Sequence, residues 1–130
     1  MPHFHLDYSR NLESLLDMPA LLVCLRDAAV ATGVFPLAGI RIRAVAVDHV
    51  IMADGATGHA FVDVTLRLAA GRDMATRTRV LDAIFSAAET FCHPVMQRSS
   101  LMLSMEMREI DPALSRKSSS IRGYLPKGAQ

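Results

Sequence analysis

The chain opens with Met1-Pro2-His3-Phe4-His5-Leu6-Asp7-Tyr8, and both the fold and the candidate chemistry start from this stretch. From His3 onward polar and apolar residues alternate, which predicts a β-strand with one buried face. A small residue such as proline after an initiator methionine usually permits removal of that methionine, which would leave Pro2 as a free secondary amine. An α-amino group ordinarily titrates near pH ~8, and burial or a nearby cation lowers its pKa toward the range of a general base. Pro2 is therefore a candidate base, although the same start suits a purely structural strand.

Length and composition limit the class of protein. With 130 residues, 51% of them hydrophobic and 21% charged, the chain predicts a single domain over residues 1–130. So large an apolar share in a small chain predicts an oligomer. The net charge of +1 and the lack of a long basic run argue against a nucleic-acid partner but leave small anionic ligands possible. No stretch approaches ~20 apolar residues and the first residues do not form a signal peptide, so we expect a cytoplasmic protein that does not enter a membrane.

The cysteines and histidines do not predict a metal site. Cys24 and Cys92 lie in apolar helical patterns without a CxxC spacing, which indicates buried free thiols. His3 and His5 share one face of the first strand, but no helical histidine pair and no suitably spaced Glu completes a ligand set. We therefore expect no bound metal.

The first half of the chain predicts a strand, a helix and a second strand. Asp17 is a suitable N-cap for the helix, and Gly33 ends its apolar pattern. Residues 40–52 then alternate and are rich in Ile and Val, as expected for a strand. Arg41 and Arg43 lie two residues apart in it, so their side chains share one face.

A turn separates this half from the next. The pair Asp54-Gly55, followed by Gly58, favours a hairpin between residues 40–52 and a strand over residues 59–69. The second of these strands alternates regularly, which predicts one apolar face and one polar face.

The second half repeats the order of the first. Asp73 is a plausible cap for a helix that Pro94 is expected to kink or shorten. A last strand is predicted over residues 100–110. The tail, residues 111–130, is rich in Ser and Lys and contains a possible strand-pairing segment from Ile121 to Leu125.

The order of elements gives two strand-helix-strand units, at about residues 2–52 and 59–110. We expect an α/β (α+β) fold built of two β-α-β units. A ferredoxin-like domain has the same order and hosts many binding modules, so the pattern alone does not give a function.

Several motifs resemble the tautomerase superfamily, and within it the 5-carboxymethyl-2-hydroxymuconate isomerases of aromatic catabolism. The resemblance covers most of the chain, and its most specific part is the second of the following stretches. They are Pro2-His3-Phe4, Thr32-Gly33-Val34-Phe35-Pro36-Leu37-Ala38-Gly39-Ile40-Arg41, Met52-Ala53-Asp54-Gly55, Ala60-Phe61-Val62 and Gly71-Arg72.

The resemblance implies a fold, an assembly and a site. It implies that the two β-α-β units form a tautomerase-like, four-stranded mixed sheet with two helices on one face, assembled as a homotrimer with active sites at subunit boundaries. It also implies that the amino-terminal proline, Pro2 here, moves the proton. Arg41 and Arg72 match the arginines that hold the substrate, and we expect Arg43 to be structural.

These implied roles agree with the chemistry of the substrate, a hydroxy-diene with three carboxylates. Free Pro2 would accept the enolic proton and return it to carbon, with no metal, flavin or nucleotide cofactor. Arginine binds a carboxylate bidentately and stays charged at any working pH, which suits Arg41 and Arg72. Arg72 near the reacting end would also stabilise a dienolate. A retained Met1 would make the nitrogen of Pro2 an amide and abolish this activity.

Two alternatives remain open from the sequence. A relative with the same fold and proline could act on another keto-enol acid or carry out a dehalogenation-type reaction. A non-catalytic trimeric or ferredoxin-like interaction module could use Pro2 only to start a strand, with Arg41 and Arg72 on solvated or subunit-contact surfaces.

Overall fold

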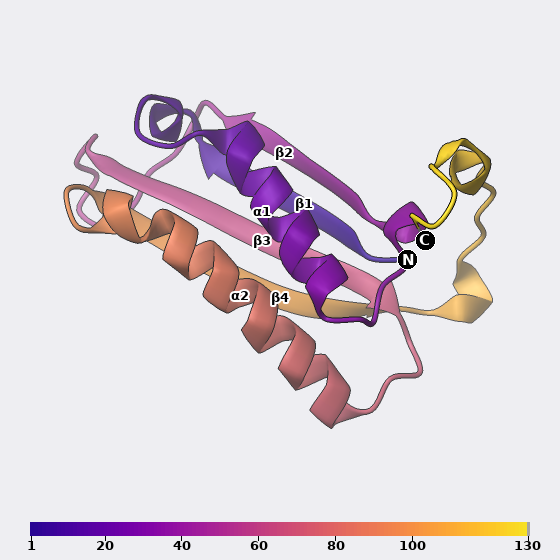
Figure 1. The fold of residues 1–130 in the computed structure, drawn as a ribbon. Helices are drawn as coiled ribbons and strands as arrows, with labels where there is room; N and C mark the ends of the chain where they lie inside the picture. Colours follow the sequence, from indigo (N-terminus) through magenta and orange to yellow (C-terminus); the bar gives the residue numbers. More distant parts are fainter. Residues whose placement is uncertain (130) are drawn as a thin grey trace.

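Four strands form one sheet in the computed structural model, which describes residues 1–129, and two helices cover one face of that sheet (Figure 1). The strands and helices, in chain order, are β1 (His3–Ser9), α1 (Met18–Ala31), β2 (Arg41–Val47), β3 (His59–Ala69), α2 (Met74–Met96) and β4 (Ser100–Ile110). Short 3-10 turns lie between and after them, at η1 (Arg10–Ser14), η2 (Leu37–Gly39), η3 (Pro112–Leu114) and η4 (Ile121–Tyr124). The two predicted strand-helix-strand units are both present.

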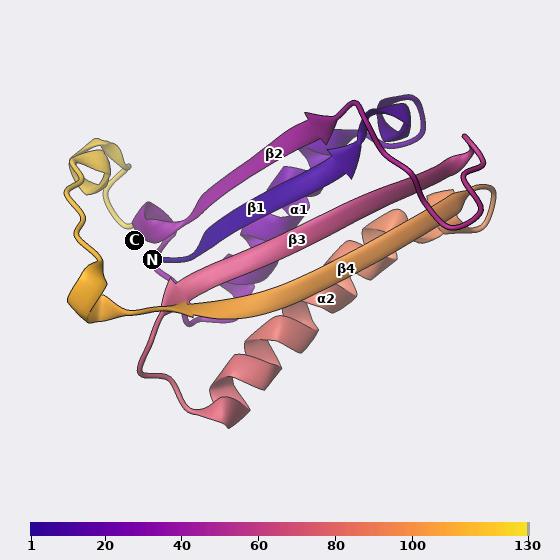
Figure 2. The ribbon, with the colours of Figure 1, turned by 180° about the vertical axis from the view of Figure 1, so that it is seen from behind.

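The sheet is mixed, as predicted. Its order is β2-β1-β3-β4, with parallel pairing at β1·β2 and β3·β4 and antiparallel pairing at β1·β3. Figure 2 shows the four strands side by side from the face that carries no helix. Each unit contributes one parallel pair, because a helix must return the chain to the same end of the sheet.

The predicted hairpin between residues 40–52 and 59–69 is wrong. β2 and β3 are not neighbours, since β1 lies between them. Asp54-Gly55 does form a turn, in which Gly55 has a positive φ of 82° and its N–H donates to the carbonyl of Met52. This turn redirects the chain around the end of β1 instead of joining paired strands.

Two other boundaries differ from the sequence prediction. β2 stops at Val47 and not at residue 52, because Val47 pairs with Ser9, the last residue of β1. Beyond it no partner strand remains on that side. The possible pairing segment near Ile121 is a 3-10 turn, in which the Gly123 N–H donates to the Ser120 carbonyl at 3.0 Å.

The helix starts follow the predicted capping residues. The side chain of Asp17 accepts a hydrogen bond from the Ala20 N–H at 3.1 Å, and that of Asp73 accepts one from the Thr76 N–H at 2.8 Å. Such bonds satisfy backbone donors that the first helical turn leaves free. α2 continues through Pro94 and ends two residues later, at Met96.

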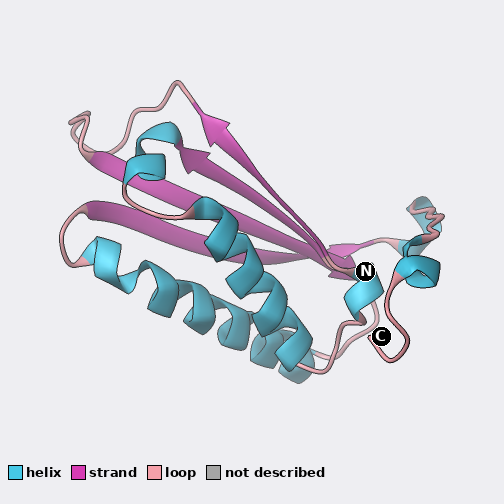
Figure 3. Cartoon of the chain, turned by 45° about the horizontal axis from the view of Figure 1, so that its top comes forward, coloured by secondary structure: helices cyan, strands magenta, loops and turns pink. Residues whose placement is uncertain are grey.

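The core lies between the helices and one face of the sheet. Alternation on the central strands places Phe4, Leu6, Val62, Val64 and Leu66 against α1 and α2, all essentially inaccessible to solvent. Figure 3 shows both helices on the same side of the sheet. The opposite face carries the alternate residues of every strand, and neither α1 nor α2 covers it.

Both cysteines are free thiols, as predicted, although only Cys92 is fully buried. Burial raises the pKa of Cys92 to about 11. Neither α1 nor α2 combines the length and apolar character that a bilayer-spanning helix requires, and no other helix among residues 1–129 does so.

Candidate functional site

A cavity of about 610 Å³ opens beside the first residues of the chain. This volume lies within the ~300–1,000 Å³ range of small-molecule pockets. The ends of all four strands and the tail after β4 form its walls, through Met1, His3, Arg41, Arg67, Ala69, Ile110, Pro112, Ser115, Arg116, Lys117 and Ser118. These residues include Arg and Lys side chains but no Asp or Glu, so the cavity favours an anionic ligand.

The topology explains why this site forms at the head of the chain. Figures 1 and 2 show the N-terminus beside η2 and the yellow C-terminal tail. Gly39 packs so closely against Met1 that an added Cβ would lie 3.3 Å from the Met1 Cγ. The starts of β1 and β2 and the tail together line one cavity.

Arg41 begins β2 and lines the cavity. Its backbone N–H donates to the Pro2 carbonyl oxygen at 3.1 Å, which holds the start of β2 against the head of the chain. Its Nη1 donates to Nε2 of His3 at 3.2 Å. Arg41 makes no ion pair with any residue of the described chain, so its charge is available to a ligand.

His3 supports Arg41 as a neutral side chain. Burial is the main cause that lowers the pKa of His3, followed by the charges of Arg41 and Arg67. A neutral imidazole that accepts from Arg41 at Nε2 carries its own proton on Nδ1. His3 therefore orients the guanidinium of Arg41 and adds no charge to the cavity near neutral pH.

Pro2 is buried directly behind Met1, and its ring nitrogen is in the peptide bond with Met1. The pKa of the Met1 amino group reflects the electrostatic environment at the head of the chain. Burial lowers the pKa of that group from its ordinary 8.0, and the charges of Lys117, Arg72 and Arg41 lower it further, in that order. The surroundings therefore favour a neutral amine at the head of the chain.

Arg72 does not line this cavity. Its guanidinium lies over the ring of Phe35, 5.4 Å from the centroid, and its Nη1 donates to the carbonyl oxygen of Ala69 at 3.2 Å. Ala69 itself lines the cavity, and the charge of Arg72 helps to lower the pKa of the Met1 amino group. Of the predicted residues, only Arg41 lines the cavity. Pro2 is buried behind the lining residue Met1, and Arg72 lies beside the lining residue Ala69.

The sequence interpretation missed three cationic residues of the cavity, Arg67, Arg116 and Lys117. Arg67 lies on the polar face of β3, as the alternation predicted, but the sequence could not reveal that this strand pairs with β1. Arg116 and Lys117 lie in a tail that matched no motif. The predicted structural residue Arg43 is exposed on β2, outside the cavity lining.

Histidine, cysteine and carboxylate side chains do not assemble into a metal-binding group of three or more anywhere in residues 1–129. His5 pairs only with Asp7, at 3.5 Å, on the open face of β1.

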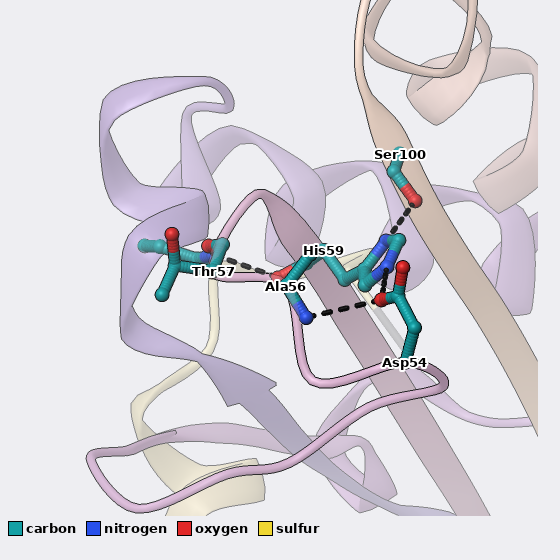
Figure 4. Close-up of polar contacts among 6 residues, drawn as sticks. Asp54, Ala56, Thr57, His59 and Ser100 are labelled. Carbon is teal, nitrogen blue, oxygen red and sulfur yellow. Dashed lines mark hydrogen bonds and ion pairs between the residues drawn. The ribbon is translucent and has the colours of Figure 1, made fainter.

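A second polar cluster lies at the opposite end of β3, where Figure 4 shows His59 between Asp54 and Ser100. Nδ1 of His59 lies 2.7 Å from the Ser100 Oγ, and Nε2 lies 2.8 Å from the Asp54 Oδ1, which also accepts from the Ala56 N–H at 3.0 Å. The side chain of Asp54 is 73% exposed, so water competes for its oxygens. We interpret this cluster as structural, because its hydrogen bonds connect the loop before β3 to the start of β4.

Comparison with known proteins identifies the family of this chain. The family model described as 5-carboxymethyl-2-hydroxymuconate isomerase matches residues 2–125. A relative from Escherichia coli, 5-carboxymethyl-2-hydroxymuconate Delta-isomerase, is 37% identical over 121 residues, which cover 93% of this chain and 96% of the relative.

Two solved structures are similar over nearly their whole length. A 5-carboxymethyl-2-hydroxymuconate delta-isomerase has a TM-score of 0.89 and 28% identity, covering 100% of this chain and 96% of the other. A 5-carboxymethyl-2-hydroxymuconate isomerase from Deinococcus radiodurans R1 has a TM-score of 0.87 and 31% identity, covering 95% of this chain and 92% of the other. The chain therefore belongs to the 5-carboxymethyl-2-hydroxymuconate isomerase family, and it is an isomerase.

Proposed function

We propose that this enzyme converts 5-carboxymethyl-2-hydroxymuconate to its 2-oxo-3-ene isomer in the catabolism of aromatic compounds, with Pro2 as the proton carrier. The observation that carries the proposal is the cationic cavity at the head of the chain, in a member of this family. The reaction exchanges an O–H for a C–H bond within one molecule, so it needs neither a cofactor nor a second substrate.

In the proposed reaction one amine performs both proton transfers. After removal of Met1, the neutral nitrogen of Pro2 accepts the proton of the enolic hydroxyl at C2, and the substrate becomes a delocalised dienolate. The Pro2 ammonium then delivers the same proton to the carbon at the far end of the diene, which leaves a carbonyl at C2 and the double bond at C3. The amine ends the cycle unprotonated.

The arginines act on the charges of the substrate. Arg41 lines the cavity without an anionic partner among the described residues, so we propose that it binds a substrate carboxylate as a bidentate pair. We assign Arg72 to binding and to stabilising the dienolate oxygen. For this role, one of two things is required. Either the Arg72 side chain moves away from the Phe35 ring, or a neighbouring subunit brings the substrate toward Arg72.

We propose further that the active unit is a homotrimer of the single domain formed by residues 1–130. The uncovered sheet face and the exposed side chains of Val45 and Met102 on it, 48% and 65% accessible, support an assembly that buries this face. Sedimentation equilibrium is expected to give three times the 14.2 kDa mass of the chain. A monomer at micromolar concentration would contradict the trimer.

The substrate test compares enols that differ in their number of carboxylates. We expect the highest kcat/KM with the tricarboxylate 5-carboxymethyl-2-hydroxymuconate. Turnover is monitored as the loss of the dienol absorbance of the substrate. The alternative is a tautomerase for another keto-enol acid, and a higher kcat/KM with a mono- or dicarboxylate enol would establish that alternative. No turnover of any enol by Met1-free protein would overturn the proposal.

The pH dependence of the reaction follows from the environment of the amino terminus. A base is active when it has lost its proton, so kcat/KM rises with pH through the pKa of the free base. Burial and the nearby cations lower the pKa of the Met1 amino group, and we expect the same surroundings to lower the pKa of the Pro2 amine and therefore the midpoint of this rise. Replacing Lys117 by Gln removes one lowering charge and is expected to move the midpoint to higher pH. Lys127→Gln, outside the cavity lining, is the control, and an equal shift in both variants would contradict this prediction.

A further inference from the structure

A row of side chains crosses the open face of the sheet at the cavity. Strand pairing places His3 opposite Arg41 on one side and opposite Arg67 on the other. The residues next along each strand, such as Phe4 and Leu66, face the helices, so these three side chains all face away from them. Two guanidinium groups therefore flank one neutral imidazole along the wall of the cavity.

In this row, Arg67 is a cation without an anionic partner among the described residues. It lies exposed on β3 and makes no ion pair within the described part of the chain. Arg108, the next residue in the row on β4, is instead neutralised by Glu106, whose Oε1 lies 2.6 Å from its Nη2. Only the first of these two arginines lines the cavity.

Lys117 brings a second uncommitted cation from the tail. Its neighbour Arg116 is tied to the backbone, because its Nη1 donates to the carbonyl oxygens of Ala113 and Ser115 at 3.1 and 2.9 Å. Lys117 makes no such bond to any described residue, yet among charged groups it has the largest effect in lowering the amino-terminal pKa. Lys117 and Met1 both line the cavity, so this charge lies on the same cavity as the head of the chain.

We propose that Arg67 and Lys117 together form a carboxylate site that binds the acid group of the substrate not held by Arg41 or Arg72. This inference rests on the proposed function, since it assigns the third carboxylate of that substrate. The planar guanidinium of Arg67 on β3 and the compact ammonium of Lys117 in the tail suit a single carboxylate, which has two acceptor oxygens. The pair thereby selects a tricarboxylate over shorter enol acids.

The decisive variant is Arg67→Gln, with Arg108→Gln as its matched control. The control residue lies in the same cross-strand row but outside the cavity. From the typical strength of charge-assisted hydrogen bonds, we expect R67Q to raise KM for 5-carboxymethyl-2-hydroxymuconate by about 10- to 100-fold. For 2-hydroxymuconate, which lacks the carboxymethyl arm, we expect a change within about threefold. R67K is expected to recover part of the loss because it keeps the charge.

Three outcomes would overturn the carboxylate site. They are an unchanged KM for the tricarboxylate in R67Q, an equal loss for both substrates, and an equal loss in R67Q and R108Q. Circular dichroism of both variants establishes that they are folded.

A binding experiment separates this site from the proposed reaction. Calorimetry with the unreactive tricarballylate is expected to show binding to the unaltered protein, weakened in R67Q and in Lys117→Gln but not in R108Q. If the protein turned over no enol but these affinities still differed, the proposed function would fail and the carboxylate site would stand. If turnover were normal and the affinities did not differ, the carboxylate site alone would fail.

Discussion

Protein that retains Met1 will isomerise 5-carboxymethyl-2-hydroxymuconate about 10²- to 10⁴-fold more slowly than protein that begins at Pro2, which is the range that general-base catalysis supplies. An amide nitrogen has no basic lone pair, and Met1 also stands in the cavity, where its Sδ lies 3.9 Å from the Nη2 of Arg41. Intact-mass spectrometry of each preparation, paired with its kcat, gives the comparison.

The matched control keeps an amine and changes only its type. Pro2→Gly, after loss of Met1, presents a primary amine at the same position and is expected to retain part of the activity, with an altered pH midpoint. Activity that does not correlate with the fraction of Met1-free chain would remove Pro2 from the mechanism and leave the cavity as a binding site only.

Arg72→Ala is expected to lower kcat by about 10²- to 10³-fold, the cost of removing one group that stabilises a developing oxyanion. The same change removes the contact with Phe35, so the measurement must separate kcat from stability. Arg72→Lys keeps the charge but loses the planar fork, and an intermediate kcat is expected. Stopped-flow turnover at saturating substrate gives kcat directly.

Arg79→Ala is the control for this change. Arg79 also donates from Nη1 to a backbone carbonyl, that of Thr32 at 3.2 Å, but it lies outside the cavity lining. Equal effects of the two replacements on kcat would indicate that Arg72 acts only on the fold. A higher KM with unchanged kcat would assign Arg72 to substrate binding alone.

Local patterns predicted most of the elements because the interactions that form them are local. The strands predicted over residues 59–69 and 100–110 coincide with β3 and β4, and the caps Asp17 and Asp73 mark the helix starts. The hairpin failed for a different reason. A turn at Asp54-Gly55 reverses the chain in the same way whether or not the strands on either side pair with each other.

The site was only partly predictable from the sequence. Arg41 was found because the family motif ends on it, and Pro2 because it follows Met1. Arg67 carried no comparable signal, since an arginine on a polar strand face is ordinarily solvated. Lys117 lies in a tail segment whose only distinctive feature is its position beside the head of the chain.

The sequence by itself determined the elements, their caps, the buried face of each strand and the family, because these depend on residues close together in the chain or on motifs read directly. Only the tertiary structure decided that β1 inserts between β2 and β3, and that the tail returns to the head. Those two arrangements place Arg41, Arg67 and Lys117 around one cavity. Strand order depends on the packing of both helices on one sheet face, a long-range balance that no local pattern encodes.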